Sequence, residues 1–297
     1  MSFSLDPVAL AAIADLELVS RRVVDGTISG LHRSPFHGYS AEFSQYRHYR
    51  PGDDLKYVDW KLFARTDRLY TKQFRETTNL WCQIALDASA SMDYAGEAGI
   101  TKFEYARLLA ASFAHLISRQ GDAVGLVAYA DGLKHYLPSR GGQAHLRSLL
   151  VALGRTEARG HTRTAAALAR TLDLLKRRGL LVLISDLYDE SEGVEQALKQ
   201  AAHIGHETIL FHVLTRAEVE LPFRDDMELE DPETGRIVLA NGAAAARSYR
   251  EAISGFLERW RARAATYGAD YVRVLTDTPL DAALRAYLRR RVLGGAA

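Results

Sequence analysis

The chain has 297 residues, of which 47% are hydrophobic and 25% are charged, and its formal net charge is +1. This length and composition allow one large α/β domain with an appendage, or two small domains. The near-zero charge gives no indication of a nucleic acid or an acidic membrane as a partner. Cys82 is the single cysteine, which excludes an intrachain disulfide. No apolar run approaches 18 residues and the N-terminus lacks the pattern of a signal peptide, so we expect a cytoplasmic protein.

Apolar strands and amphipathic helices alternate from residue 80 onward, after an expected helix at 8–24. Such alternation predicts an α/β fold with a doubly wound, mostly parallel sheet. The turn signal Asp131-Gly132 predicts that the strand after it returns as an antiparallel edge strand. The segment 221–241 is expected to form a small hairpin that carries no chemical motif. The expected strands are 80–86, 123–129, 133–137, 180–184, 208–214 and 271–275, and the expected helices are 103–117, 144–153, 164–176, 194–203, 247–267 and 280–290.

One carboxylate and two hydroxyls follow the first of these strands at alternating positions, as Asp87, Ser89 and Ser91. Residues two apart in a non-helical loop point to the same side, so the three oxygens can converge on a hard divalent cation. The pattern alone is also compatible with a plain turn before a helix, in which Asp87 or Ser91 bonds backbone amides.

Two later segments offer oxygen ligands in the chain order that such a site needs. Thr162 lies two residues after Gly160 and just before an expected helix, and Asp186 ends an apolar strand. Ligands of open α/β sheets bind outside the carboxyl ends of the strands, where both aspartates would project. The combination resembles the metal-ion-dependent adhesion site of von Willebrand factor A domains, with the five motif positions taken by Asp87, Ser89, Ser91, Thr162 and Asp186.

The types of ligand indicate recognition rather than turnover. Most of them are neutral hydroxyls, which leave positive charge on a bound Mg²⁺, or on Mn²⁺ or Ca²⁺, so the cation can accept a carboxylate from a partner. We therefore expect a metal-dependent protein-interaction module that is not an enzyme. Two alternatives stay open: a metal-dependent phosphoesterase that uses Asp87, Asp186 and an N-terminal acid, and a structural scaffold with a vestigial metal site.

The first 78 residues do not share the alternation of strands and helices. Between positions 30 and 75 the chain has nine Lys or Arg, five Asp or Glu and ten aromatic residues. Aromatic and basic residues together could bind single-stranded nucleic acid, but the carboxylates offset much of the charge, so we expect no nucleic-acid partner. A nuclease-like cluster of histidines with Asp53 or Asp59 follows no metal-binding template, the histidines being His32, His37 and His48.

A long motif in this segment resembles the DUF58 family of bacterial and archaeal proteins. Its residues are Arg47, Tyr49, Pro51, Gly52, Asp53, Asp54, Lys56, Val58, Asp59, Trp60, Ala64 and Arg65. The resemblance implies an N-terminal extension, here 1–78, followed by a von Willebrand factor A-like domain at 79–291. It also implies a partner, a MoxR-type AAA+ ATPase encoded beside such proteins. Many relatives have N-terminal transmembrane segments, whereas we expect no membrane span here.

We predict that this motif is architectural first and a binding surface second. Its large aromatic residues alternate with charged groups, as at a packed junction between domains. Trp60 is therefore expected to be largely buried. Asp59 is expected to cap the helix that starts at Trp60, or to pair with Arg47 or Arg65, because an unpaired buried carboxylate is costly.

Overall fold

The computed structural model describes residues 15–29, 40–50, 58–77, 80–175, 177–189, 191–222, 225–285 and 288. The chain divides into two compact units, a smaller one of residues 36–80 and a larger one made by the rest. Each unit is described by itself. Five residues of the DUF58-like motif lie outside the described residues: Pro51, Gly52, Asp53, Asp54 and Lys56.

The larger unit is built on a six-stranded sheet with the strand order β10-β7-β6-β3-β4-β5. All neighbouring strands are parallel except β5, which pairs antiparallel with β4 at the edge. This confirms the predicted doubly wound α/β fold and its antiparallel edge strand. The strands are β3 (Trp81–Asp87), β4 (Ala123–Tyr129), β5 (Leu133–Arg140), β6 (Leu180–Ser185), β7 (Glu207–Leu214) and β10 (Asp270–Leu275).

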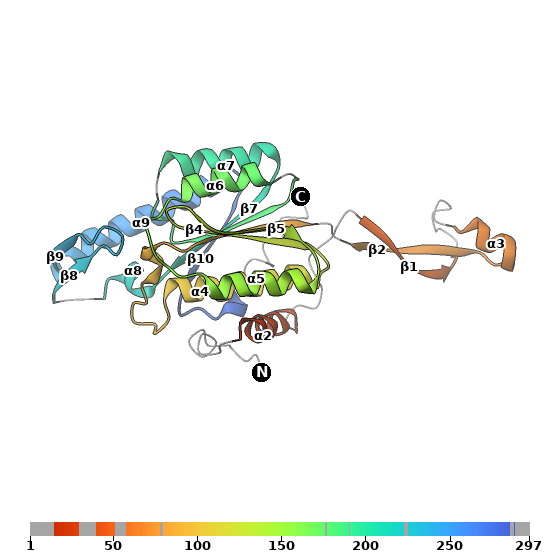
Figure 1. Ribbon diagram of the computed structural model, residues 1–297, viewed down its shortest axis with the longest axis horizontal. Helices are drawn as coiled ribbons and strands as arrows, with labels where there is room; N and C mark the ends of the chain where they lie inside the picture. The colour runs from red at the N-terminus through yellow and green to blue at the C-terminus, as the bar shows by residue number, and fades with distance from the viewer. Residues whose placement is uncertain are drawn as a thin grey trace. The chain divides into compact units, whose positions relative to one another are not determined.

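Helices cover both faces of this sheet (Figure 1). One face carries α4 (Lys102–Arg119) and α5 (Gln143–Arg155), with α2 (Leu16–Ser29) packed outside them. The other face carries α6 (Thr164–Leu174), α7 (Glu192–Ile204) and α9 (Gly242–Thr266). These helices form because apolar residues recur every three or four positions, which places them on the side that meets the sheet.

On the second face, the apolar sides of the helices pack against the sheet and form a core. Leu168 of α6, Leu198 of α7 and Trp260 of α9 are buried in one cluster with residues of the central strands. On the first face, α4 begins with a capping box in which the Thr101 side chain and the Glu104 side chain each bond the other's backbone amide. We predicted that residues 1–78 form one N-terminal extension. Helix α2 comes from that stretch, but it packs against α4 in the larger unit.

A short hairpin follows β7, the fifth strand of the six-stranded sheet in chain order, in agreement with the sequence. It consists of β8 (Asp226–Glu230) and β9 (Ile237–Asn241), which lie between the short helix α8 (Arg216–Glu220) and α9. The turn between the two strands has Gly235 at φ +66°, a conformation that favours glycine. Among the described residues, no helix combines the length and the apolar composition needed to cross a membrane.

The smaller unit is an antiparallel pair of strands with one short helix. β1 (Ser40–His48) pairs with β2 (Tyr70–Thr77), and α3 (Trp60–Thr66) lies in the connection between them. The sequence analysis did not predict these two strands, because the aromatic and charged residues alternate without an apolar face. Asp59 is the N-cap of α3 and accepts hydrogen bonds from the backbone amides of Lys61 and Leu62. The predicted capping role of Asp59 is therefore confirmed.

The prediction that Trp60 is largely buried is wrong. Its exposed fraction is 57%, and its ring meets the ring of Phe63 edge-on with 6.2 Å between the centroids. The reason is the size of the unit: the described part offers one two-stranded sheet and two turns of helix, with no second layer to cover an indole ring at the start of α3.

Candidate functional site

The two aspartates expected to bind a cation lie at the same edge of the sheet. Asp87 ends β3, Asp186 directly follows β6, and the two strands are parallel neighbours. Carboxyl ends of parallel strands meet at one edge, so both side chains reach the same place, and both are completely buried.

Asp87 is held by hydroxyl and amide groups around it. Its Oδ1 accepts from the backbone amide of Ser89 at 3.0 Å, and its Oδ2 accepts from Ser185 Oγ at 2.7 Å. Burial, and after it the nearby charge of Asp186, raise the pKa of Asp87 to about 7, although the hydrogen bonds from Ser185 and Ser89 oppose this shift. The carboxyl group therefore stands in surroundings that lack a compensating positive charge.

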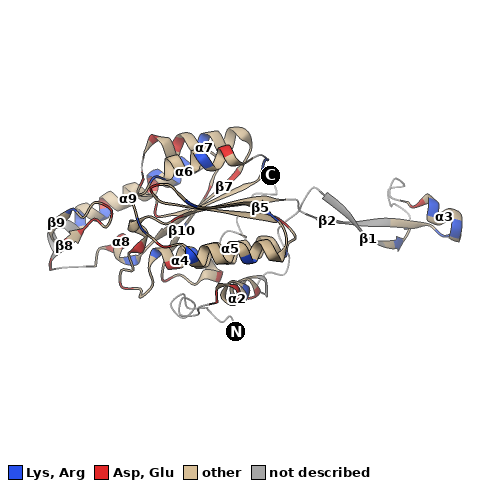
Figure 2. Cartoon of the chain, in the orientation of Figure 1, with Lys and Arg blue, Asp and Glu red and all other residues tan. Residues whose placement is uncertain are grey.

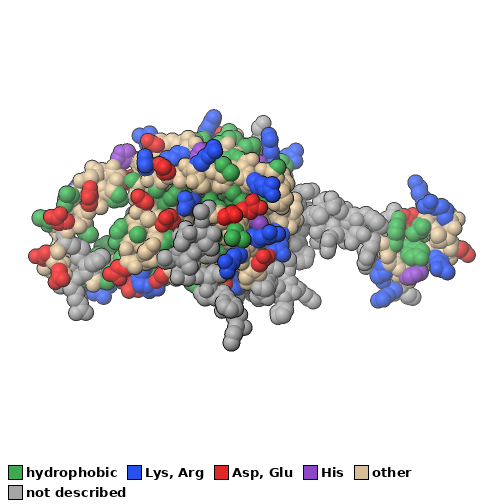
Figure 3. All heavy atoms as spheres, turned by 60° about the horizontal axis from the view of Figure 1, so that its bottom comes forward, with side chains coloured by type: hydrophobic (Ala, Val, Ile, Leu, Met, Phe, Trp, Pro, Cys, Tyr) green, Lys and Arg blue, Asp and Glu red, His purple; other side chains and the backbone are tan. Residues whose placement is uncertain are grey.

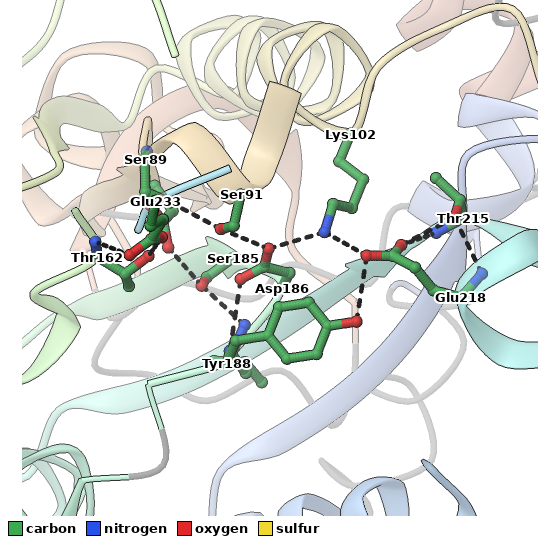
Figure 4. Close-up of polar contacts among 12 residues, drawn as sticks. Ser89, Ser91, Lys102, Thr162, Ser185, Asp186, Tyr188, Thr215, Glu218 and Glu233 are labelled. Atoms are coloured by element: carbon green, nitrogen blue, oxygen red, sulfur yellow. Dashed lines mark hydrogen bonds and ion pairs between the residues drawn. The ribbon is translucent and has the colours of Figure 1, made fainter. Parts of the chain in front are cut away.

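A chain of hydroxyl groups joins Ser89 to Asp186 (Figure 4). Ser89 Oγ lies 3.1 Å from Ser91 Oγ, and Ser91 Oγ donates to Asp186 Oδ2 at 2.8 Å. Four of the five predicted ligands are thus linked to one another by hydrogen bonds. The alternating spacing of Asp87, Ser89 and Ser91 produces this arrangement, because the chain stays extended through Ser89 before the short 3-10 helix η2 (Ala90–Asp93) begins.

Thr162, the fifth predicted ligand, lies on the neighbouring loop. Gly160 has φ +88°, and its carbonyl accepts from the backbone amide of Ala90 at 2.9 Å, which fastens this loop beside η2. Thr162 itself bonds Glu233 in the turn between β8 and β9: its amide donates to Oε2 at 2.9 Å and its hydroxyl donates to Oε1. The segment 221–241 shows no chemical motif in its sequence, yet its Glu233 bonds a predicted ligand.

Lys134 also connects the loop that carries Thr162 to the residue after β3. Lys134 Nζ donates to the carbonyls of Ala88, Glu157 and Arg159 at 3.1, 2.8 and 2.8 Å. Three carbonyls from two loops around one ammonium keep these loops together, so Lys134 of the antiparallel edge strand contributes to the shape of the site.

The sequence analysis also missed a buried cation beside Asp186. Lys102 Nζ donates to Asp186 Oδ2 at 2.8 Å and to Glu218 Oε1 at 2.5 Å, and only 1% of the lysine side chain is exposed. Burial opposes the lysine charge, but Asp186 and then Glu218 outweigh this effect, so the pKa of Lys102 is raised. Lys102 stands among apolar residues of α4, and no local sequence pattern marks it as part of the site. The capping-box pattern Thr215-x-x-Glu218, by contrast, could have marked Glu218 as a structured carboxylate.

The loop after Asp186 has an unusual backbone that buried groups hold in place. Leu187 has φ +56°, a conformation that costs a residue with a Cβ about 1 to 2 kcal/mol. Its amide donates to Ser185 Oγ at 2.9 Å, and its carbonyl accepts from the indole of Trp260 at 3.0 Å. Trp260 on α9 therefore positions the loop on which Asp186 lies.

Two of the five predicted ligands, Ser91 and Thr162, line a groove of about 1220 Å³. Lys102 also lines it, together with Glu230 and Glu233 of the hairpin. Asp and Glu residues are numerous on α8 and β8, as Figure 2 shows. In Figure 3 the end of the unit that holds the hairpin displays hydrophobic and acidic side chains together, in keeping with exposed Leu229, Ile237 and Leu239.

The residues fit a hard divalent cation in their donor chemistry. Every side-chain ligand atom of the five is an oxygen, as Mg²⁺ and Ca²⁺ prefer, and the raised pKa of Asp87 shows that its surroundings disfavour the carboxylate form, which a bound cation would stabilise. Among the described residues, no three His, Cys, Asp or Glu side chains are grouped so as to hold a metal by themselves. A cation here would depend on the hydroxyls of Ser89, Ser91 and Thr162.

Residues 45–261 match the family described as "Protein of unknown function DUF58". The chain belongs to the DUF58 family. The uncharacterized protein Rv1480 of Mycobacterium tuberculosis is similar to this DUF58 chain, with 31% identity over 234 residues that cover 77% of this chain and 73% of the relative. The uncharacterized protein YeaD of Bacillus subtilis is 28% identical over 133 residues, or 44% of this chain and 30% of that one.

Two solved structures are similar to part of this chain. A conserved hypothetical protein BatB from Bacteroides thetaiotaomicron has a TM-score of 0.48 and 18% identity, covering 72% of this chain and 99% of that one. The SpRpn10 VWA domain has a TM-score of 0.43 and 14% identity, covering 70% of this chain and 94% of that domain. The von Willebrand factor A-like fold of this DUF58 chain is itself visible in the strand order and in the antiparallel edge strand.

The family motif and the candidate cation ligands belong to different units. The described motif residues Arg47, Tyr49, Asp59, Trp60 and Arg65 all lie in the smaller unit, whereas the five predicted ligands lie in the larger one. Within the smaller unit, Tyr46 OH donates to Asp59 Oδ2 at 2.8 Å, so Asp59 joins β1 to α3.

Proposed function

We propose that this DUF58 protein is a metal-dependent protein-interaction module. In this proposal a divalent cation, with Mg²⁺ as the leading candidate, is held by Asp87, Ser89, Ser91, Thr162 and Asp186 and binds a carboxylate of a protein partner. The observation that supports it is the hydrogen-bonded chain from Asp87 through the two serines to Asp186, at the edge of the sheet where a groove opens.

The balance of charges favours recognition over turnover. Two carboxylates and three neutral hydroxyls leave a divalent cation electrophilic, and an acidic group from outside can complete its oxygen shell. Lys102 already shares the charge of Asp186, which leaves still less negative charge for the cation. A partner that presents Glu or Asp is the ligand that this chemistry selects.

The proposed partner is a MoxR-type AAA+ ATPase, on the strength of the resemblance of the DUF58 motif. The acidic group could lie on the ATPase or on a client protein that the two hold together. The smaller unit, with its exposed Trp60 and its basic residues, offers a second contact surface that is independent of the cation.

Thermal unfolding with and without Mg²⁺ tests the cation. A ligand that binds only the folded state, at a concentration 100-fold above its Kd, adds about 2.7 kcal/mol to the free energy of unfolding, so Mg²⁺ should raise the Tm. Asp87→Ala should abolish this rise, while Asp93→Asn, at an exposed aspartate on η2, should keep it. An undiminished rise in Asp87→Ala would place the cation elsewhere.

Capture of the purified MoxR-type ATPase tests the partner. Capture should require Mg²⁺, fail in EDTA and weaken in Ser89→Ala and Ser91→Ala without loss of folding. Equal capture in EDTA and Mg²⁺ would show that the contact lies away from the cation. If Mg²⁺ changed neither stability nor capture, the structural scaffold would be the better explanation, and hydrolysis of phosphate esters that vanished in Asp87→Ala would support the phosphoesterase.

A further inference from the structure

Glu233 occupies a position that a partner's carboxylate would be expected to take. Both of its oxygens bond Thr162, one through the backbone amide and one through the hydroxyl. Only 18% of its side chain is exposed, and the imidazole of His161 lies 3.9 Å from Oε2. A carboxylate of the chain itself therefore lies at the site proposed for recognition of carboxylates.

The turn that carries Glu233 is shaped to present this side chain. Asp231 Oδ1 accepts from the amide of Glu233 at 2.9 Å, and Asp231 Oδ2 accepts from the hydroxyl of Thr234 at 2.5 Å. Two backbone bonds close the turn: Asp231 N donates to Arg236 O at 2.9 Å, and Gly235 N donates to Asp231 O at 2.8 Å. Side-chain and backbone bonds at one turn reduce the entropy that ordering Glu233 would cost.

The rest of the hairpin is held less firmly. Leu229, Ile237 and Leu239 expose 41, 56 and 74% of their surface, so the hairpin buries little apolar area of its own. Its strands have five residues each. A two-stranded hairpin with so little burial is marginally stable by itself, so its displacement from the groove requires little free energy.

The buried polar network of this unit has more carboxylates than ammonium groups. Asp186 and Glu218 share the one ammonium of Lys102, and Glu233 bonds Thr162 (Figure 4). Bringing a carboxylate toward other carboxylates is unfavourable unless positive charge is present, so the position of Glu233 is consistent with a site that attracts anions when a divalent cation is bound.

We infer that Glu233 is an internal ligand that closes the site, and that an acidic partner binds by displacing the β8–β9 hairpin from the groove. The inference rests on the function proposed above and adds its regulation: the chain competes with its partner for the same place. Because the internal carboxylate is tethered, its effective concentration is on the order of millimolar, so a free ligand with a Kd of about 10 to 100 μM is weakened roughly tenfold to 100-fold.

The test uses the internal ligand itself as the probe. A fluorescently labelled, head-to-tail cyclised peptide with the sequence of residues 230–237 is titrated with the full-length protein in Mg²⁺ and in EDTA. Glu233→Gln should bind this peptide at least tenfold more tightly than the wild type, and EDTA should abolish the binding. The matched control Asp226→Asn removes the same charge from the same hairpin, at an exposed residue outside the groove, and should behave as the wild type. The same peptide with Gln in place of Glu233 should not bind.

Two results would overturn the inference and differ from a failure of the proposed function. In the first result, the wild type and Glu233→Gln bind the peptide equally, or neither binds it, while Mg²⁺ still raises the Tm of both proteins. The cation site would then be supported, and the role of Glu233 would be limited to stabilising the loop of Thr162. If Mg²⁺ raised the Tm of neither protein, the proposed function would fail, and the internal ligand with it.

Discussion

Replacing Lys102 by Met would test whether the site depends on its buried cation. The ammonium bonds Asp186 at 2.8 Å and Glu218 at 2.5 Å, and the side chain is 1% exposed. Methionine has similar length and volume, so the substitution removes the charge without opening a large cavity. Asp186 would then be buried without its partner, while Glu218 is partly exposed and would recover some hydration.

Removal of one partner from a buried ion pair typically costs about 3 to 5 kcal/mol. Ser91 Oγ still donates to Asp186, and Glu218 is 13% exposed, so we expect the lower end of this range, about 3 kcal/mol. That is a large share of the roughly 5 to 15 kcal/mol by which folded domains are stable. A second substitution, Glu218→Gln, should return part of the loss, because it removes one of the two carboxylates left without the positive charge of Lys102.

Urea unfolding followed by tryptophan fluorescence measures this cost, because Trp260 is 1% exposed in the core of the same unit. The midpoint should fall with the slope unchanged. Lys199→Met, at an exposed position of α7, is the matched control and should change the free energy of unfolding by less than about 0.5 kcal/mol. A Lys102→Met protein as stable as this control would refute the reasoning.

Two further predictions concern a buried histidine and the smaller unit. Burial lowers the pKa of His212 to about 3, whereas the unfolded chain takes up its proton near pH 6.5, so its contribution to stability is complete above pH 6.5 and is lost as the pH falls toward 3. Between pH 6.5 and 5 this residue should lower the free energy of unfolding by about 2 kcal/mol, and His212→Asn should lack that part of the pH dependence; identical pH profiles would contradict it. Asp59→Ala should cost α3 about 1 kcal/mol, seen as faster amide hydrogen exchange at Lys61 and Leu62, whereas Trp60→Ala, at a residue 57% exposed, should change stability by less than about 1 kcal/mol.

The arrangement of the larger unit could be predicted from local patterns. Apolar runs such as Leu180–Ser185 and Ala123–Tyr129 are strands because buried strands need apolar residues on both faces, and the helices between them repeat every three or four residues. The order of elements then implies that Asp87 and Asp186 meet at one edge, because both follow parallel strands. The antiparallel edge strand followed from the turn Asp131-Gly132 alone.

The smaller unit was harder to predict because its pattern is ambiguous. Phe43, Tyr46 and Tyr70 lie on strands β1 and β2, but charged and aromatic residues alternate there without a continuous apolar face. Trp60 looked like a core residue because large aromatic side chains dominate packed junctions. Whether Trp60 is exposed depends on how many layers of secondary structure the unit has, and a local sequence pattern does not indicate this.

The polar partners of the candidate site were decided by the tertiary structure. Lys102 lies 84 residues from Asp186 and 116 from Glu218, and Glu233 lies 71 residues from Thr162. A side chain's local sequence determines the strand or helix that carries it, but the partner of a charged group depends on the register of the sheet and on the path of the connecting loops. The sequence therefore determined which oxygens gather at the end of the sheet, and only the folded chain decided that a buried lysine shares Asp186 and that Glu233 bonds Thr162.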